Sequence, residues 1–133
     1  MNELIQHYLN ISGFTIIFKF DEDFDEEITD RIQEHRSYMS FSEGERSRID
    51  IAIMMALRDL AKLRSAISLN VLVIDESDST LDPDGQIAFM EILKSLEDTN
   101  VIIISHNYDI YQEYANKKYN LIKNNNFTYI ENS

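Results

Sequence analysis

The sequence predicts an α/β domain in which a parallel β-sheet is flanked by helices and the chain closes with a hairpin. Two short apolar runs, Val71 to Ile74 and Val101 to Ile104, flank a helical pattern that begins at Pro83. A strand, a helix and a strand with short joints form a βαβ unit, whose strands are parallel and end side by side. The run from Val71 favours a strand buried on both faces, as in parallel sheets covered by helices, and a long amphipathic helix is predicted after Ser42.

Composition narrows the class of protein. The chain has 133 residues, 44% of them hydrophobic, with three glycines and one proline, which predicts a single globular domain over residues 1–133. Cysteine is absent, so thiolate and disulfide chemistry are excluded. The longest apolar run, Ile51 to Leu57, is too short to cross a bilayer, and no signal-peptide pattern precedes it. We therefore expect a soluble, cytoplasmic protein without a membrane partner.

The charge is strongly acidic. Twelve bases against 24 acids give a formal net charge of -12, which should repel a phosphate backbone and argues against DNA binding by this chain alone. Seven of the ten residues from Asp21 to Asp30 are acidic. Such a run is usually a solvated loop, and the alternative is a docking surface for a basic partner.

The first 40 residues predict a helix, a strand and a second helix. A one-sided apolar stripe within residues 1–10 indicates a short helix that looks like the end of a longer one. From Gly13 the period changes to two, so Phe14 to Phe20 is expected to be a half-buried strand. After the acidic run we expect a short helix near Glu26 to Glu34.

Ser42 begins the long amphipathic helix. Ser42 and Glu45 form a capping box, S-x-x-E, which leaves free backbone N–H groups at the helix start, a position that attracts anions. Capping boxes are common, so the motif alone is also explained by a simple helix start. The apolar residues repeat at helical spacing: Ile49, Ala52, Ile53, Ala56, Leu57, Leu60 and Ala61.

Two carboxylates follow the first strand of the βαβ unit. Asp75 and Glu76 stand at its C-terminal end, where α/β folds place their chemistry. In nucleotide-hydrolysing folds of this kind an Asp there holds phosphate-bound Mg²⁺, and a neighbouring acid can polarise the attacking water. The pair taken alone is equally consistent with a strand that ends in exposed acids.

The rest of the chain completes the unit. Asp82 is the expected N-cap of the crossover helix, which should run from Pro83 to about residue 97. The parallel strands place Ser105 and His106 beside the acid pair, although a histidine after a strand is often only a polar turn residue. A helix over residues 108–115 and a hairpin of 119–123 with 127–130 should follow, joined by an Asn-rich turn.

The order of motifs resembles the C-terminal half of an ABC-type ATPase head of the SbcC and SMC-like DNA-repair class. Phe41 to Glu45 is similar to the ABC signature, and Val71 to Glu76 is similar to Walker B with its catalytic Glu. Ser79 to Asp82 resembles the D-loop, and His106 resembles the switch histidine. Within this class the stretch from Phe14 to the hairpin is most similar to the SbcC-like subunit of bacteriophage recombination endonucleases.

The resemblance implies roles for these residues. Asp75 would coordinate Mg²⁺ through water, Glu76 would be general base for the attacking water, and His106 would contact the γ-phosphate of ATP. In this family the signature of one head closes over ATP held by another head. Ser42 and Gly44 would therefore complete the site of a partner head in a homodimer.

The same resemblance assigns Glu45 and Asp82 to the nucleotide-binding segments, and it also shows departures from the family pattern. Glu43 stands where the family commonly has Gly and adds negative charge near a triphosphate. Ser77 and Asp78 stand where many members have Pro-Thr.

No phosphate cradle is present in this sequence. A P-loop needs G-x-x-x-x-G-K-[ST], and none of Gly13, Gly44 and Gly85 is followed by Lys. In SbcC-like proteins the cradle lies in an N-terminal lobe that a long coiled coil separates from the C-terminal lobe. The resemblance therefore implies an N-terminal P-loop lobe as partner, residues 1–12 as a coiled-coil stub, and inactivity of this chain alone.

Two functions remain open at this point. The first is the C-terminal lobe of an ATP-driven subunit, with a metal-dependent nuclease subunit as partner and DNA contacted through the assembled complex. The second is a non-enzymatic acidic decoy that docks on an SbcC-like head, which the net charge and the missing P-loop favour. Retention of Asp75, Glu76 and His106 together argues against the decoy, which needs neither a metal ligand nor a base.

Overall fold

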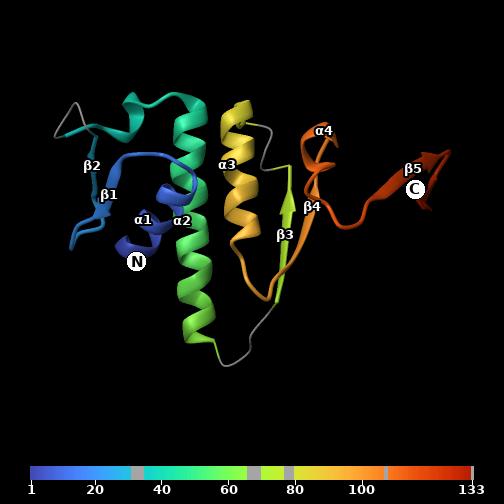
Figure 1. Cartoon of the computed structure of the whole chain (residues 1–133), viewed down its shortest axis with the longest axis horizontal. Helices are drawn as coiled ribbons and strands as arrows, with labels where there is room; N and C mark the ends of the chain where they lie inside the picture. The colour runs from blue at the N-terminus through green and yellow to red at the C-terminus, as the bar shows by residue number, and fades with distance from the viewer. Residues whose placement is uncertain (31–34, 66–69, 77–79, 107, 133) are drawn as a thin grey trace.

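The computed structural model of the chain describes residues 1–30, 35–65, 70–76, 80–106 and 108–132. The chain contains both helices and strands, with a long central helix and a βαβ unit after it (Figure 1). The elements are α1 (Asn2–Ile11), β1 (Ile17–Phe20), β2 (Glu26–Thr29), the 3₁₀ helix η1 (Tyr38–Ser40), α2 (Glu43–Arg64), β3 (Val71–Asp75), α3 (Pro83–Lys94), β4 (Asn100–Ile104), α4 (Tyr108–Tyr111), β5 (Tyr119–Asn124) and β6 (Phe127–Asn132).

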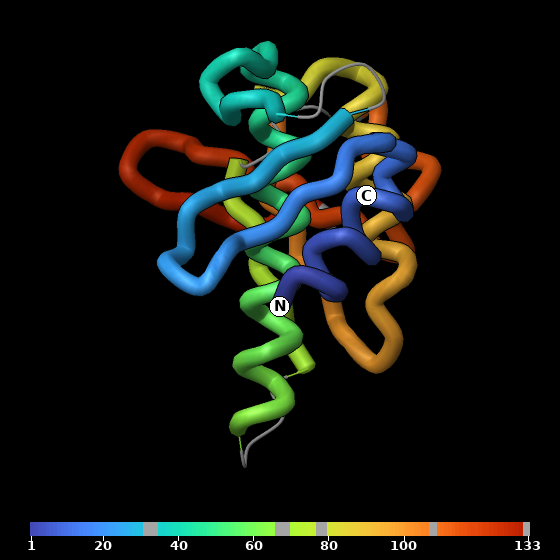
Figure 2. The backbone as a smooth tube through the Cα atoms, turned by 90° about the vertical axis from the view of Figure 1, so that its left-hand side faces the viewer, coloured from blue at the N-terminus to red at the C-terminus, as the bar shows by residue number. Residues whose placement is uncertain are grey.

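Helices α2 and α3 form the middle layer of the molecule. In Figure 1 they stand side by side, with α1 and the β1–β2 pair on one side and the parallel β3–β4 pair on the other. Figure 2, turned by 90°, shows the β1–β2 pair crossing in front of α2. The N-terminal ends of α2 and α3 and the C-terminal ends of β3 and β4 all lie at the same end of the molecule. That end therefore collects the predicted site residues.

One connected apolar core holds these layers together. α1 contributes Ile5 and Leu9, both with no exposed surface, against α2. Two amide side chains of α1 also bond the backbone of β1 and of the residue before it: Asn2 Nδ2 donates to the carbonyl of Phe20 at 2.9 Å, and Gln6 Nε2 donates to that of Ile16 at 2.9 Å. These bonds satisfy strand groups that would otherwise lack partners away from water. α1 is thus an integral part of the fold.

The expected helix near Glu26 to Glu34 is wrong for its first half. Residues 26–29 form β2, which pairs antiparallel with β1, while residues 31–34 lie outside the described part. The physical reason is Ile28, which is 2% exposed and pairs directly with the equally buried Phe18 of β1. Cross-strand burial of this apolar pair outweighs the helix propensity of the two glutamates before it. The alternation predicted for β1 is confirmed, although the strand begins at Ile17.

The long helix after Ser42 is confirmed, but only its first half is buried. The buried residues of α2 are Ile49, Ile51, Ala52, Met55 and Ala56. Leu57 was expected to face the core and is 52% exposed, and Leu63 is 79% exposed. Figure 2 shows why: the C-terminal turns of α2 project beyond the body of the protein, where no other described element covers them.

The βαβ unit is confirmed, with β3 and β4 parallel and in the register Val71 to Asn100 through Asp75 to Ile104. Burial differs from the prediction. One face of the pair contacts the core through partly or fully buried side chains such as Ile74, whereas the other face is uncovered. The uncovered side chains are 46–57% exposed and all β-branched: Val71, Val73, Ile102 and Ile104. Within the part of the chain that the structure describes, this apolar sheet face remains open.

The chain ends in the predicted hairpin of β5 and β6, turned by Asn125, whose φ of 55° is the left-handed conformation that Asn tolerates. The helix expected over residues 108–115 is shorter, because α4 ends at Tyr111 in a turn closed by the Tyr114 amide. Among the residues that the structure describes, no helix has both the length and the hydropathy needed to cross a membrane.

Candidate functional site

The ends of β3 and β4 bring the acid pair and the histidine together, as the parallel strands predict. Asp75 is the last residue of β3 and stands opposite Ile104, the last residue of β4. The backbone N–H of Glu76 donates to the carbonyl of Ile104 at 2.9 Å, so the ladder extends one residue past the strand. Glu76 Oε1 lies 2.9 Å from His106 Nε2. Strand register thus sets this pair.

Glu76 has a strained backbone. Its φ is 50°, in the left-handed region that non-glycine residues rarely occupy and that costs on the order of 1–3 kcal/mol. The side chains of Glu76 and His106 are 56% and 92% exposed, and exposed ion pairs contribute little stability. The contact therefore does not explain the strain. A carboxylate at a strained strand end with an imidazole at hydrogen-bonding distance is suited to handling a proton or a water molecule.

The start of α2 carries the capping box that the sequence predicts. Ser42 Oγ accepts from the Glu45 amide at 3.3 Å, and Glu45 Oε2 accepts from the Ser42 amide at 2.8 Å and from its hydroxyl at 2.9 Å. The backbone hydrogen bond from Ser42 is the main reason that the pKa of Glu45 lies below its ordinary value. Ser42 and Glu43 are both exposed, so this helix start is open to a ligand.

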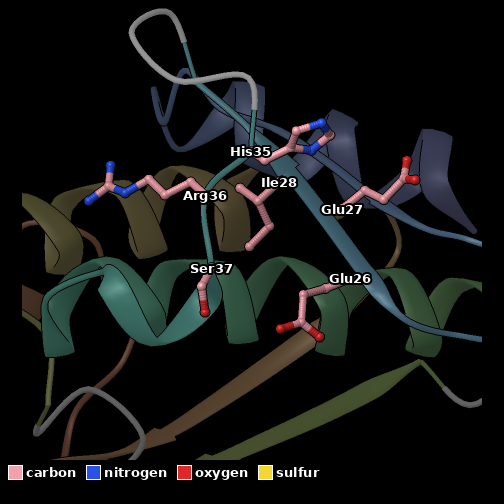
Figure 3. A pocket seen from close by; sticks show the side chains of 6 residues that line it. All are labelled: Glu26, Glu27, Ile28, His35, Arg36 and Ser37. Atoms are coloured by element: carbon pink, nitrogen blue, oxygen red, sulfur yellow. The ribbon is translucent and has the colours of Figure 1, made fainter.

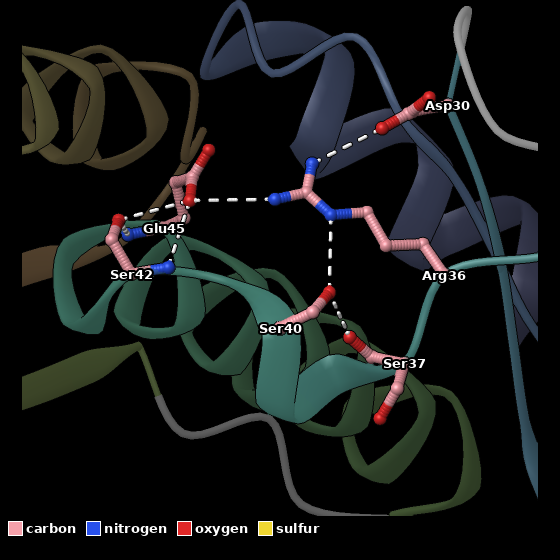
Figure 4. A network of polar contacts seen from close by, with 6 residues as sticks. All are labelled: Asp30, Arg36, Ser37, Ser40, Ser42 and Glu45. Atoms are coloured by element: carbon pink, nitrogen blue, oxygen red, sulfur yellow. Dashed lines mark hydrogen bonds and ion pairs between the residues drawn. The ribbon is translucent and has the colours of Figure 1, made fainter.

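Arg36 fixes the segment that leads into α2, a role that the sequence did not reveal. Figure 4 shows its guanidinium between three segments of the chain: it donates to Asp30 at 3.1 Å and to Ser40 Oγ at 3.2 Å, and it lies 4.0 Å from Glu45 Oε2. The same guanidinium lies 3.7 Å from the ring centroid of Phe41, which is 3% exposed. Buried Phe41 therefore anchors the chain directly before the exposed helix start.

Asp82 caps α3 and also contacts α2. Its Oδ1 accepts from the Gly85 amide at 2.7 Å, the N-cap bond predicted from the sequence, and from Arg48 at 2.8 Å. The Arg48 hydrogen bond is the main cause of a lowered Asp82 pKa. Gly44 lies against the same carboxylate, since a Cβ there would be 3.4 Å from Asp82 Cγ. The structure thus groups Gly44 with Asp82, which the sequence placed in separate motifs.

A metal or nucleotide would meet only part of a site here. Carboxylate oxygens suit Mg²⁺, which is usually held by one or two carboxylates together with substrate phosphates. Asp75 and Glu76 offer this donor chemistry, and among the described residues no cluster of three or more His, Asp or Glu side chains could hold an ion by itself. The residues present therefore fit a shared Mg²⁺–phosphate site and do not fit a site formed wholly by protein groups.

A shallow pocket of about 200 Å³ lies elsewhere (Figure 3). None of the residues predicted to carry chemistry lines it, so it gives no support to a catalytic role. Its lining consists of Glu26, Glu27, Ile28, His35, Arg36 and Ser37.

Comparison with known proteins finds relatives among the exonuclease subunits of bacteriophages. The chain is 44% identical over 115 residues to exonuclease subunit 2 of Enterobacteria phage T4, a match that covers 86% of this chain and 20% of the relative. It is 47% identical over 106 residues to exonuclease subunit 2 of Escherichia phage RB69, a match that covers 79% of this chain and 19% of the relative. The chain thus spans about a fifth of the length of these relatives. No family model matches it.

Solved structures share its fold. An SMC head domain from Thermotoga maritima matches with a TM-score of 0.75 and 24% identity, covering 99% of this chain and 46% of that one. A chain from a study of ATP-driven dimerization and DNA-stimulated activation of SMC ATPases matches with a TM-score of 0.79 and 14% identity. This match covers 99% of the present chain and 82% of the other chain.

Proposed function

We propose that this chain, a homologue of the phage exonuclease subunit 2 proteins with the fold of an SMC-type ATPase head, is the C-terminal lobe of an SbcC-like ATPase subunit of a DNA nuclease complex. The observation that carries the proposal is the strand-end arrangement of Asp75, Glu76 and His106 on parallel β3 and β4. A decoy would not need this arrangement. The activity proposed is ATP hydrolysis that drives DNA processing in recombination and repair.

Each residue at the strand ends has a distinct proposed role. Asp75 would hold Mg²⁺, which when bound neutralises the phosphate charge that develops during hydrolysis. Glu76 would orient the attacking water and accept its proton. His106, at 2.9 Å from Glu76, would hold that carboxylate in position and offer an N–H to a phosphate oxygen. The strained backbone of Glu76 supports this division, since strain concentrates at functional sites.

The ATP site needs a second lobe. No P-loop occurs in the sequence, so the phosphates must be cradled by another segment or chain. The uncovered apolar face of Val71, Val73, Ile102 and Ile104 supports this, because parallel sheets are normally covered on both faces. An N-terminal P-loop lobe would bury this face. It would also bring the phosphates of the ATP that it holds to Asp75. We infer that the chain alone does not turn over ATP.

The start of α2 would contact a second ATP molecule, not the one at Asp75. The first turn of α2 would form an anion-binding end, and the exposed Ser42 hydroxyl, which donates to Glu45 in this structure, would turn to donate to the incoming phosphate. In a dimer of two heads this end would close over ATP held by the partner head, with Gly44 and Glu45 beside it. Exposed Glu43 would keep its charge in solvent.

The wider assembly follows from the same proposal. A metal-dependent nuclease subunit would be the functional partner, and DNA would be contacted through the assembled complex, because the net charge of -12 opposes binding by this lobe alone. α1 would mark residues 1–12 as the point where a coiled coil meets the lobe, and the complex would act in the cytoplasm of the host cell.

The acidic decoy is the second candidate, and the net charge together with the apolar sheet face favours it. Such a protein would use the sheet face to dock on the P-loop lobe of another subunit and block it. The coding sequence beside this chain discriminates between the two candidates, because a P-loop followed by an in-frame coiled coil is expected only for a lobe.

The test of the proposed function is the Glu76→Gln variant in a head reconstituted from this chain and a P-loop lobe. Gln keeps the size of the side chain and removes its basicity, so ATP binding should persist while kcat falls by about 10²- to 10⁴-fold. Glu91→Gln, at an exposed position of α3, is the matched control and should retain turnover. Wild-type turnover in the Glu76→Gln head would rule out Glu76 as the base.

A further inference from the structure

The C-terminal hairpin of β5 and β6 stands apart from the rest of the described chain. Its two strands contact each other far more than they contact any other element. Figure 1 shows the hairpin at the end of the molecule away from the β1–β2 pair. A two-stranded hairpin by itself is only marginally stable in water, and further strands or a helix usually support one. The hairpin therefore has surface that another molecule can cover.

The hairpin and the residues that lead into it are basic, although the chain as a whole is acidic. Residues 116–130 contain three of the twelve basic residues and none of the 24 acidic residues. These three, Lys117, Lys118 and Lys123, are all exposed. The next acid, Glu131, lies near the end of β6, away from the turn of the hairpin. This segment therefore attracts phosphate groups, whereas most of the chain repels them.

Two exposed rings lie on one face of β6. Phe127 is 79% exposed and Tyr129 is 48% exposed. They are two positions apart on a strand, so their side chains leave the same face at a spacing of about 7 Å. Within the described part of the chain, neither ring has another ring or a cation as its partner. Both rings are therefore free to stack on a planar group.

Lysines beside exposed rings are the combination that holds single-stranded nucleic acid. The lysines contact phosphates, and aromatic rings stack on successive bases whatever their sequence. In a duplex the bases stack on each other, so their faces are closed to protein rings unless a base is flipped out. The turn of the hairpin adds the exposed amides of residues 124–126, which both donate and accept hydrogen bonds.

We propose that the β5–β6 hairpin is a contact site for single-stranded DNA. Phe127 and Tyr129 stack on unpaired bases, and the lysines of residues 116–130 contact the phosphates. The inference deepens the proposed function, because it names the surface through which this lobe meets the DNA of the assembled complex. The acidic turn of residues 21–25 lies at the other end of the molecule (Figure 1), and salt screens charges separated by more than about 10 Å at 0.1 M.

The test is the affinity of this chain for a fluorescein-labelled oligo-dT of about ten nucleotides, measured by fluorescence anisotropy at about 0.1 M salt. The net charge of -12 keeps wild-type binding weak, with a dissociation constant of about 10⁻⁴ M. Phe127→Ala should weaken binding at least about fivefold, because one base loses its stacking partner. Phe127→Trp keeps a planar ring and should retain the wild-type affinity.

Phe24→Ala is the matched control for loss of an exposed ring. Phe24 is 70% exposed, but its neighbours in the turn between β1 and β2 are acidic. Its replacement should leave the affinity for oligo-dT unchanged. Equal losses in the two Ala variants, or no loss in Phe127→Ala, would overturn the proposal.

The lysines are tested through the salt dependence of binding. Lys117→Met/Lys123→Met should make the plot of log affinity against log salt concentration shallower by about 1.4, because each phosphate contact on a single strand contributes about 0.7. Lys19→Met/Lys62→Met removes the same charge from exposed positions elsewhere and should leave the slope unchanged. An unchanged slope in the hairpin variant would also overturn the proposal.

Base stacking is tested with a blunt duplex of the same length. Phe127→Ala should bind this duplex as well as the wild-type chain does, because paired bases do not reach the ring. A loss with the duplex equal to the loss with oligo-dT would contradict stacking on unpaired bases.

Amide NMR spectra of the chain identify the occupant of the hairpin. Oligo-dT should shift the signals of residues 119–130 and leave those of the acidic turn unshifted. If a P-loop lobe shifted the hairpin signals and oligo-dT did not, the hairpin would be a contact between lobes and the proposal would be wrong.

None of these measurements needs ATP or a second lobe, so this inference and the proposed function can fail separately. Absence of ATP turnover in the reconstituted head would remove the proposed function and leave the DNA contact to be judged from the affinities. Wild-type affinity of Phe127→Ala for oligo-dT would remove the DNA contact and leave ATP hydrolysis untouched.

Discussion

Glu45 and Asp82 are two carboxylates whose main task is to hold helix starts. Glu45 accepts from the amide of Ser42, and Asp82 accepts from Gly85 and Arg48. These bonds favour the charged forms, so both pKa values lie below the ordinary values of 4.5 and 3.8. A carboxylate with a lowered pKa in the folded state stabilises the fold above its ordinary pKa, and this contribution is lost as the pH falls.

The first prediction concerns this loss of stability as the pH falls. Between about pH 6 and about pH 3 the melting temperature of the wild-type chain should fall more than that of the Glu45→Gln/Asp82→Asn double variant. Gln and Asn keep the capping geometry but do not titrate, so the pH-dependent contribution of the two sites is removed. The measurement is thermal unfolding monitored by circular dichroism across this pH range.

The control for this experiment removes two carboxylates elsewhere. Glu22→Gln/Asp23→Asn changes the net charge equally in the exposed acidic turn. The melting temperatures of the capping double variant, the control and the wild type could also fall by the same amount as the pH is lowered. In that case the lowered pKa values would not contribute to the stability of the fold.

Single residues also mark the limit of sequence-based prediction for the site. Ser42, Glu45 and Asp82 were predictable because capping is local, with donor and acceptor three residues apart. Arg48 was not, because its partner lies 34 residues away and meets it only when α2 packs beside α3. The positive φ of Glu76 was equally hidden, since no local pattern marks a strained glutamate.

At the scale of elements, α1 is held by the core more than by its own sequence. A ten-residue helix is marginal in isolation, so its order depends on tertiary packing. Ile5 and Leu9 have no exposed surface, and Asn2 and Gln6 bond the backbone of β1 and the residue before it. The helix therefore stabilises both α2 and the β1–β2 pair.

The second prediction measures this contribution. Leu9→Ala should lower the free energy of unfolding by about 2–5 kcal/mol, because it leaves a cavity between α1 and α2. Leu63→Ala, at a position 79% exposed on the projecting end of α2, should change it by less than about 0.5 kcal/mol. Urea denaturation of the two variants and the wild type gives both values. Equal stability of the two variants would contradict the assignment of α1 to the core.

Elements were predicted well where their pattern is local. The βαβ unit followed from two apolar runs and a capped helix between them, and the hairpin followed from an Asn-rich turn. β2 was missed because Glu26 and Glu27 favour helix locally, and only pairing of Ile28 with Phe18 makes the segment a strand. The far end of α2 was expected to be buried, since its apolar stripe does not reveal where covering elements stop.

At the scale of the whole molecule, the uncovered sheet face is the main support for the proposal that this chain functions as part of a larger head. The sequence predicted a strand buried on two faces, and the structure covers one. Four β-branched side chains remain about half exposed on the other face. A surface of this kind usually marks an interaction site.

The third prediction concerns this face. Val73→Lys places a charge at its middle, 57% exposed in the chain alone, so the variant should fold normally. Its binding to a P-loop lobe should weaken by at least about 100-fold, because association would bury an unpaired ammonium. Leu63→Lys is the matched control on a face that the proposal leaves free. Binding is measured by isothermal titration calorimetry, and undiminished binding of Val73→Lys would place the lobe elsewhere.

The central claim is tested most directly by Mg²⁺-dependent ATP hydrolysis, measured for this chain, for a P-loop lobe from the same source, and for the two mixed. On the proposed function each piece holds half of the site: this chain would supply Asp75, Glu76 and His106, and the other lobe would supply the phosphate cradle. We predict turnover only in the mixture. No turnover in a mixture whose two pieces are folded and bound to each other would contradict the claim and favour the regulatory decoy.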